Sequence, residues 1–158
     1  MKKAPIDHTD KKILNMLQHD ATMPVAEIAA MVNLSPTPCW RRIQRMEDKG
    51  IITRRVAILD AQKLNLAVTV FVAVKTSQHS EAWFKKFHRV VMAIPEVLEF
   101  YRMSGDIDYL LRIVVPDIAR YDKVYRRLIE GTELFDVSSS FAMEQLKLTT
   151  VLPLEYVD

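Results

Sequence analysis

One segment sets the organisation of the N-terminal half, and it reads Ser35-Pro-Thr-Pro-Cys-Trp-Arg-Arg-Ile-Gln-Arg-Met-Glu-Asp-Lys-Gly50. A serine followed by a proline favours a helix start, because serine caps the first turn and proline fits the first helical position. The glycine at position 50 predicts the end of that helix. One face of the helix is expected to pack inward, since apolar side chains recur on it at helical spacing: Cys39, Ile43 and Met46.

The opposite face of the same helix is polar and basic, which suggests contact with a nucleic acid. Arg41 and Arg45 lie four residues apart and therefore share a side of the helix. Arginine hydrogen-bonds phosphates and guanine edges, and glutamine suits adenine. We therefore expect DNA contacts from this helix and from two arginines that follow it: Ser35, Thr37, Arg41, Arg42, Gln44, Arg45, Arg54 and Arg55.

The segments on either side give this helix its context. Apolar residues recur at helical spacing over residues 6–17 and 25–32, and Asn33-Leu34 makes a tight turn before the basic helix. Residues 51–59 are rich in β-formers and predict a hairpin with Arg54-Arg55 near its tip. A basic helix by itself is more often a solvated surface helix. The preceding helix and turn instead favour a winged helix-turn-helix DNA-binding domain over residues 1–59.

Composition and charge agree with this division of the chain. Of the 158 residues, 49% are hydrophobic and 27% charged, as in an ordinary globular protein. Residues 1–59 carry ten Lys and Arg against six Asp and Glu, a net +4, whereas residues 60–158 carry twelve against fourteen, a net −2. Only the first part has the excess that suits a polyanion. The single cysteine excludes an intrachain disulfide and fits a reducing cytoplasm, and no apolar run is long enough to span a membrane.

The C-terminal half alternates strands and helices after a linker at residues 60–65. Strands are expected at residues 66–74, 97–103, 108–115 and 136–143, and helices are expected to follow Ser80 and Asp117. This βαββαβ order predicts a ferredoxin-like domain over residues 66–158, with a further edge strand at Leu146–Leu152. The whole chain is thus expected to have an α+β fold.

The expected sheet is apolar on both faces. Tyr109 and Leu111 alternate with Leu110, so apolar side chains point to both sides of one strand. Two helices cover only one face of a four-stranded sheet, and a face left in water should be polar. We infer that a second copy of the chain covers the other face, most simply through a twofold axis.

A second candidate site is the turn at residues 103–108. Its glycine permits a tight turn and the close approach of a ligand to the backbone. The two aspartates could hold an ammonium group while exposed N–H groups take a carboxylate, as an α-amino acid requires. Gly-Asp is also common in plain β-turns, which spacing alone favours. The residues expected to bind such an effector are Met103, Ser104, Gly105, Asp106, Ile107 and Asp108.

No motif indicates catalysis, a metal ion or a cofactor. The four histidines lack metal-ligand spacing, and the serines at 138–140 lack the glycines of a nucleophile elbow. No glycine-rich phosphate loop is present. We therefore expect a protein that is not an enzyme and that binds no cofactor beyond a small effector.

Taken together, these motifs resemble the Lrp/AsnC, or feast/famine, family of transcriptional regulators, essentially from end to end. The most specific segments are Asn33–Ile51, Ser104–Arg112, Val115–Asp117 and Ser139–Phe141. The runs at 102–105 and 140–147 resemble the DecR branch, which is linked to cysteine-responsive control.

The resemblance implies a homodimer that assembles into an octamer around which DNA can wrap. It implies that the helix at Ser35–Lys49 enters the major groove, and that an amino acid, with cysteine as a candidate, binds between dimers at Ser104–Asp108. Two other interpretations stay open. One is an architectural DNA-wrapping protein without an effector, and the other is a ligand-binding or enzymatic module in which the basic helix is incidental.

Overall fold

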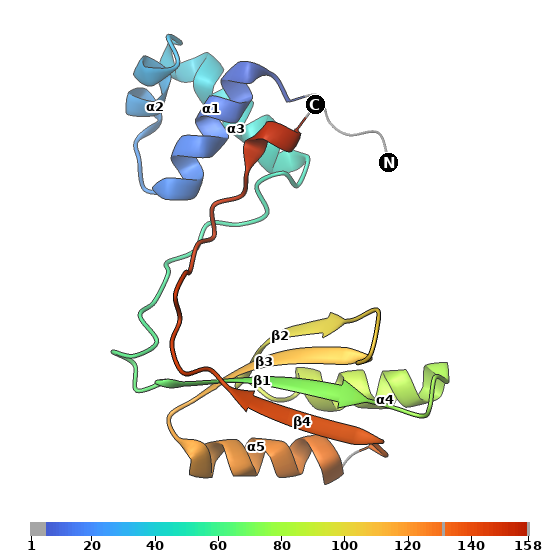
Figure 1. Ribbon diagram of the computed structural model, residues 1–158. Helices are drawn as coiled ribbons and strands as arrows, with labels where there is room; N and C mark the ends of the chain where they lie inside the picture. Colours follow the sequence, from blue (N-terminus) through green and yellow to red (C-terminus); the bar gives the residue numbers. More distant parts are fainter. Residues whose placement is uncertain (1–5, 131, 158) are drawn as a thin grey trace. The chain divides into compact units, whose positions relative to one another are not determined.

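The computed structural model describes residues 6–130 and 132–157 and divides into two compact units (Figure 1). The first unit combines the residues up to Ile58 with those from Lys147 onward. The second runs from Leu59 to Leu146. No helix among the described residues combines the length and the apolar character that a membrane crossing needs.

Among its described residues, the first unit has the α-helices α1 (His8–His19), α2 (Val25–Met31) and α3 (Pro36–Asp48). A reciprocal cap begins α1: the Asp7 carboxylate accepts from the Asp10 amide at 2.8 Å, and the Asp10 carboxylate accepts from the Asp7 amide at 3.2 Å. Such a box satisfies two amides that have no partner within the helix. By contrast, α2 has no side-chain cap, because Pro24 occupies its N-cap position.

The boundaries of α3 confirm the prediction. Ser35 is its N-cap residue and Pro36 its first residue, although the serine hydroxyl makes no capping hydrogen bond. Gly50 follows the helix with a φ of 68°, a left-handed conformation that costs glycine little. Asn33 adopts a φ of 55° and turns the chain between α2 and α3. These two residues, with positive φ, lie just before and just after α3.

The three helices share one apolar core, which fixes how α3 is oriented within the unit. Full burial of an aliphatic side chain contributes about 1.5–3 kcal/mol. The buried members come from all three helices: Ile13, Leu17, Ile28, Ala29, Cys39, Ile43 and Met46. The face of α3 that was expected to pack inward therefore does so.

The hairpin expected over residues 51–59 does not form in this described part of the chain. Residues 53–60 are extended but lie in no strand. A hairpin needs a second strand within a few residues. Here the Asp60 carboxylate instead accepts from the amides of Gln62 and Lys63, at 3.0 and 3.3 Å, and starts a turn. The extended run thus ends before any partner strand follows it.

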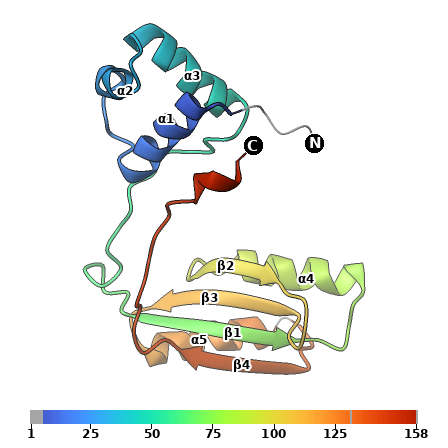
Figure 2. The same ribbon diagram turned by 45° about the horizontal axis from the view of Figure 1, so that its top comes forward.

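The second unit confirms the ferredoxin-like order. Its elements follow one another as β1 (Val68–Lys75), α4 (Glu81–Met92), β2 (Val97–Arg102), β3 (Tyr109–Val115), α5 (Ile118–Glu130) and β4 (Asp136–Phe141). The strands lie in the order β2-β3-β1-β4, and every neighbouring pair is antiparallel (Figure 2).

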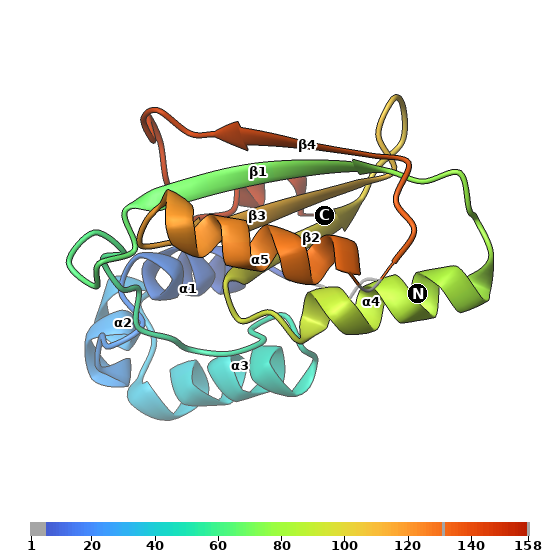
Figure 3. The same ribbon diagram turned by 90° about the horizontal axis from the view of Figure 1, so that it is seen from below.

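Both helices pack on the same face of this sheet (Figure 3). Ser80 caps α4 through its hydroxyl, which accepts from the Trp83 amide, and Asp117 accepts from the Arg120 amide at the start of α5. The core between helices and sheet is built from alternate strand residues and one stripe of each helix: Val70, Val72, Val74, Phe87, Val91, Leu111, Ile113, Val124 and Leu128, among others.

The opposite face of the sheet mixes apolar and charged residues, with Arg112 of β3 paired directly across from Phe71 of β1. Phe71 on β1 is 39% exposed there, beside Leu110 and Val114 of β3. An ion pair between Arg112 and Glu99, 2.6 Å apart, crosses this face. The face is therefore less uniformly apolar than the sequence predicted, although its centre still exposes a phenylalanine.

The C-terminal segment differs from expectation. The edge strand expected at Leu146–Leu152 is absent from these described residues, which are extended and lead into a short 3₁₀ turn, η1 (Leu154–Tyr156). The segment also groups with the first unit, whereas residues 66–158 were expected to form one domain. The reason is burial, since Leu154 and Val157 line an apolar hollow on α1 instead of lying on an exposed sheet edge.

Candidate functional site

The first candidate site is the face of α3 that points away from its core. With Cys39, Ile43 and Met46 buried, helical periodicity places Thr37 and Arg41 on the opposite side. Both of these side chains are exposed. An exposed face with a hydroxyl and a guanidinium can donate hydrogen bonds to phosphates and to base edges.

Two of the predicted arginines are engaged within the unit. Arg42 donates to the carboxylates of Asp7 at 2.6 Å and Asp10 at 2.9 Å. Arg45 donates to the second oxygen of Asp10 at 2.5 Å. Asp10 is only 1% exposed, so this carboxylate is buried and its charge is balanced by two arginines whose side chains stay partly in solvent. The two arginines therefore hold the start of α1 against α3.

The pKa values agree with this ion network. The hydrogen bond from Arg42 lowers the pKa of Asp7 below its usual value, and the Asp10 amide acts in the same direction. The same hydrogen bonds to Asp7 and Asp10 raise the pKa of Arg42. Both shifts stabilise the charged forms, so the pair stays ionised at neutral pH.

The other predicted DNA-contact residues also form two groups, those bonded within the unit and those exposed. Gln44 is half-buried and donates to Glu47 at 2.7 Å. Arg55 donates to the other oxygen of Glu47 at 2.9 Å and reaches the Ala21 carbonyl at 3.5 Å. Arg54 and Ser35 are exposed. The face that is most available to a partner is therefore formed by Ser35, Thr37, Arg41 and Arg54.

Sequence reasoning missed one residue on this helix. Trp40 is 51% exposed on α3, next to Arg41. Large aromatic side chains left half in water often mark a contact surface. The signal in the sequence is its position, because helical spacing places it off the buried stripe of Cys39 and Ile43.

The second candidate site is the turn between β2 and β3. Gly105 has a φ of 114°, a conformation that side-chain-bearing residues rarely adopt. The turn is closed by the Met103 amide, which donates to the Asp108 carbonyl at 2.8 Å. Ser104, Gly105 and Asp106 are exposed, whereas Ile107 and Asp108 are half-buried. The glycine thus has the conformational role that the sequence predicted.

The two aspartates of this turn have different surroundings. The Asp108 carboxylate accepts a 2.8 Å hydrogen bond from the Thr76 amide, and the Asp108 amide donates to the Val74 carbonyl. This side chain therefore ties the turn to the end of β1. Asp106, in contrast, projects from the exposed tip. Of the two carboxylates expected to hold an ammonium group, only that of Asp106 is placed at the surface.

Cys39 has a packing role. It is fully buried in the core of the first unit, and burial raises the pKa of its thiol. A protonated, buried thiol is a poor nucleophile. Among the described residues, no three His, Cys, Asp or Glu side chains are grouped to hold a metal ion.

Comparison with protein families assigns a description to each part of the chain. Residues 6–53 match a model described as "Winged helix-turn-helix DNA-binding". Residues 69–152 match a model described as "Lrp/AsnC ligand binding domain". The first match contains α3 and the second contains the turn at residues 103–108.

Relatives match nearly the whole chain. The DNA-binding transcriptional activator DecR of Escherichia coli is 50% identical, and the match covers 95% of this chain and 99% of DecR. The crystal structure of an AsnC family transcriptional regulator from Agrobacterium tumefaciens is 61% identical, with a TM-score of 0.91 over 95% of this chain and 98% of that one. A Neisseria meningitidis transcriptional regulator, solved in complex with L-Met, is 34% identical, with a TM-score of 0.90 over 96% and 98%.

Proposed function

Because the chain belongs to the Lrp/AsnC family of DNA-binding transcriptional regulators, we propose that it binds duplex DNA through α3 as a homo-oligomer and responds to an amino acid. The observation that carries the DNA contact is the exposed polar face of α3, with Thr37 and Arg41 opposite its buried stripe. It lies in the part of the chain that has a net charge of +4. We place the protein in the cytoplasm, where DNA and a reduced Cys39 are both found, and assign it no catalytic reaction.

In this proposal, α3 enters the major groove with Arg41 and Thr37 toward the DNA. Arg54, beyond the helix, contacts the phosphate backbone. Gln44 would exchange its bond to Glu47 for a base edge, and Arg55 would exchange its bond to the same carboxylate for a phosphate. Arg42 and Arg45 act mainly by holding α3 to α1, which fixes the orientation of the exposed face of α3 within the unit.

A second copy of the chain is the proposed partner for the open sheet face of the second unit. The exposed Phe71, with Leu110 and Val114 beside it, supports burial of this face against an identical one. A twofold dimer would place two α3 helices on half-sites about one helical turn apart, or a multiple of that spacing. Assembly of such dimers into an octamer is the state that the family resemblance implies.

The proposed effector is a small molecule, an amino acid, at the turn of residues 103–108. The related regulator from Neisseria meningitidis was solved with L-Met, which supports this class of ligand. The exposed Asp106 suits the ammonium group, and exposed backbone amides suit the carboxylate. Because the turn is exposed on a single protomer, residues of another copy would complete the binding site. Binding that favours one assembly would then shift the population that fits the DNA.

A DNA-wrapping protein without an effector is the second candidate. It is favoured by the hydrogen bond from Thr76 to Asp108, which leaves only one carboxylate of the turn at the surface. The two candidates make the same prediction for DNA and opposite predictions for amino acids.

One experiment separates them. Genomic fragments that the purified protein retains are selected with no addition, and then with L-methionine, L-cysteine, L-leucine or L-glutamate. Enrichment of defined fragments that changes with one amino acid supports the proposed function. Enrichment that no amino acid changes, together with an unchanged melting temperature and oligomeric state, favours the architectural protein. Failure to retain any duplex contradicts both.

A further inference from the structure

The C-terminal segment contacts α1 through a pair of hydrogen bonds typical of a strand partner. The Gln18 side-chain amide donates to the Leu152 carbonyl at 3.1 Å, and its oxygen accepts from the Leu152 amide at 2.9 Å. One glutamine thus satisfies both backbone groups of one extended residue. Such a reciprocal pair selects a single register of the segment against the helix.

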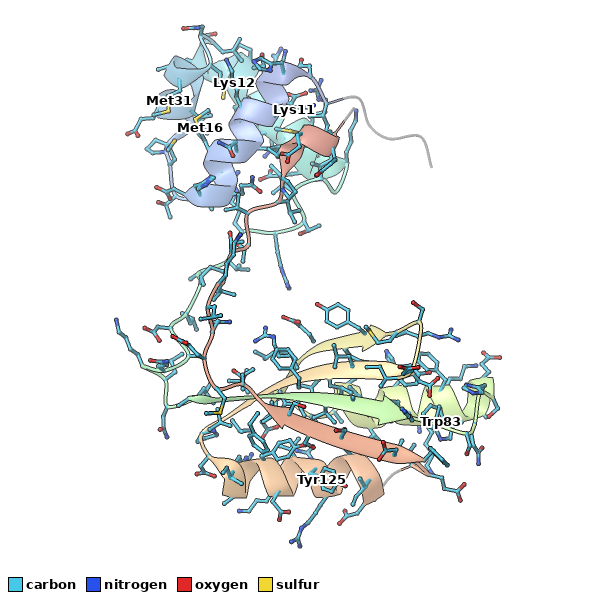
Figure 4. All side chains as sticks on the ribbon, viewed as in Figure 1. Lys11, Lys12, Met16, Met31, Trp83 and Tyr125 are labelled. Atoms are coloured by element: carbon cyan, nitrogen blue, oxygen red, sulfur yellow. The ribbon has the colours of Figure 1, made fainter. Side chains whose placement is uncertain are left out.

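A second contact holds the segment about two turns nearer the start of α1. The Lys11 ammonium donates to the Val157 carbonyl, immediately after η1 (Figure 4). Lys11 and Gln18 are seven residues apart, about two turns, and so lie on the same face of α1. The segment therefore follows α1 over two turns and is held at both ends.

Between these two polar contacts, apolar side chains of the segment line a hollow against α1. Leu152, Leu154 and Val157 line a hollow of about 380 Å³ together with residues of α1 and of the segment after α3: Leu14, Leu17, Ile51 and Ile52. Leu14, Ile51 and Ile52 are partly buried residues that pack against the core of this unit. The segment thus shares an apolar hollow with residues that pack against the core of the first unit.

We propose that residues 150–157 form an intramolecular, non-covalent clasp on α1 and so tie the DNA-binding unit a second time to the ligand-binding domain, through the chain that leaves β4. The first connection is the linker at residues 60–65, which enters β1. The second leaves β4 through residues 142–149 and ends on α1. Neither the helix-turn-helix nor the effector assignment requires this contact, which follows from the paired bonds of Gln18, the bond from Lys11 and the shared hollow.

Hydrogen exchange on the full chain tests whether the clasp forms. In the wild type, the Leu152 amide should exchange slowly although it lies in no strand or helix. Gln18→Ala removes both bonds and should speed that exchange about five- to tenfold, as expected for the loss of about 1 kcal/mol. Gln145→Ala makes the same chemical change at an exposed position and should leave the rate unchanged. Fast exchange of Leu152 in the wild type would overturn the proposal.

Zero-length cross-linking tests whether the clasp is made within one chain. Glu155 lines a shallow hollow with Lys11 and Lys12, so a carbodiimide should join it to one of these lysines. Light and ¹⁵N-labelled chains are mixed in denaturant, refolded together and cross-linked. Cross-linked peptides that are all light or all heavy support the proposal. Cross-linked peptides that join a light to a heavy chain would show that the segment binds another copy, which would overturn the proposal. The proposal would also be overturned if the wild type formed no such cross-link, or if the Glu155→Gln variant still formed it.

Discussion

The arginines of α3 look alike in the sequence but have two kinds of environment. Arg41 is exposed opposite the buried stripe, whereas Arg42 and Arg45 are bonded to Asp10. The amphipathic pattern predicted which side of the helix is polar. It could not predict the ion network, because Asp10 lies more than 30 residues away and meets α3 only through the packing of α1.

The exposed arginine should contribute directly to DNA affinity. We expect Arg41→Ala to weaken binding about tenfold or more, since one arginine contact to a base or phosphate is worth roughly 1–3 kcal/mol. Fluorescence anisotropy with a retained fragment measures this. Arg126→Ala removes an exposed arginine from α5 and serves as the matched control. Equal affinities for the two variants would remove Arg41 from the interface.

The bonded arginine should instead contribute to stability. We expect Arg42→Ala to reduce the free energy of unfolding by about 1–2 kcal/mol, because two charge-assisted hydrogen bonds are lost and Asp10 keeps one arginine, Arg45, beside the Asp7 amide. Denaturant titration of the first unit measures this loss. A variant as stable as the wild type but deficient in DNA binding would show that Arg42 acts at the DNA.

The Asp7–Arg42 pair also predicts a pH dependence. The folded pKa of Asp7 is lowered below 3.8, so its contribution is complete above about pH 4 and is lost as the pH falls through the lower folded value. Asp7→Asn should therefore lower the melting temperature at pH 7. The difference from the wild type should shrink as the pH approaches 3. A difference that is constant over this range would contradict the role of the charge.

Substitutions of the two aspartates of the β2–β3 turn should have different effects, one on the response to an amino acid and the other on thermal stability. Asp106→Asn should blunt the response to an amino acid and leave the melting temperature unchanged, because this side chain lies at the exposed tip. Asp108→Asn should lower the melting temperature, because it weakens the acceptor for the Thr76 amide. Calorimetry with and without the amino acid measures both. A normal dose response in Asp106→Asn would exclude this carboxylate from the site.

At the scale of elements, the sequence predicted what local chemistry determines. Ser35-Pro36 and Ser80 start helices where expected, and the strands of the ferredoxin-like order form close to their expected positions. The two extended segments outside the sheet were misjudged. Apolar residues at residues 51–59 and 146–152 favour a strand locally, but a strand also needs a partner, and local sequence carries no information about one.

The open sheet face leads to a prediction about assembly. Phe71 lies at the centre of that face on β1, so Phe71→Glu would bury a charge between two copies. We expect this variant to sediment as a smaller species than the wild type while its far-ultraviolet circular dichroism stays the same. Lys86→Glu, on the exposed side of α4, is the control. A Phe71→Glu protein of unchanged mass would show that this face is not the interface.

At the scale of the molecule, the excess of positive charge is concentrated in one of two units. If a dimer neutralises roughly eight phosphates, log affinity should fall with log salt concentration at a slope of about −7. Arg41→Ala in both copies should make this slope less steep. A flat salt response would contradict a phosphate-dominated interface.

The two chain connections between the units should both matter for an effector response. Inserting Gly-Ser-Gly-Ser after Lys147 lengthens the second connection without touching the clasp contacts of Gln18 or Lys11. If the clasp transmits changes from β4 to α1, the inserted chain should bind DNA with wild-type affinity but no longer change that affinity with the amino acid. The same insertion after Ser77, in the exposed loop before α4, should preserve the response. If both inserted chains respond to the amino acid as the wild type does, the effect of the amino acid reaches the DNA-binding unit through the linker at residues 60–65. If the wild type itself does not respond, the effector assignment is contradicted.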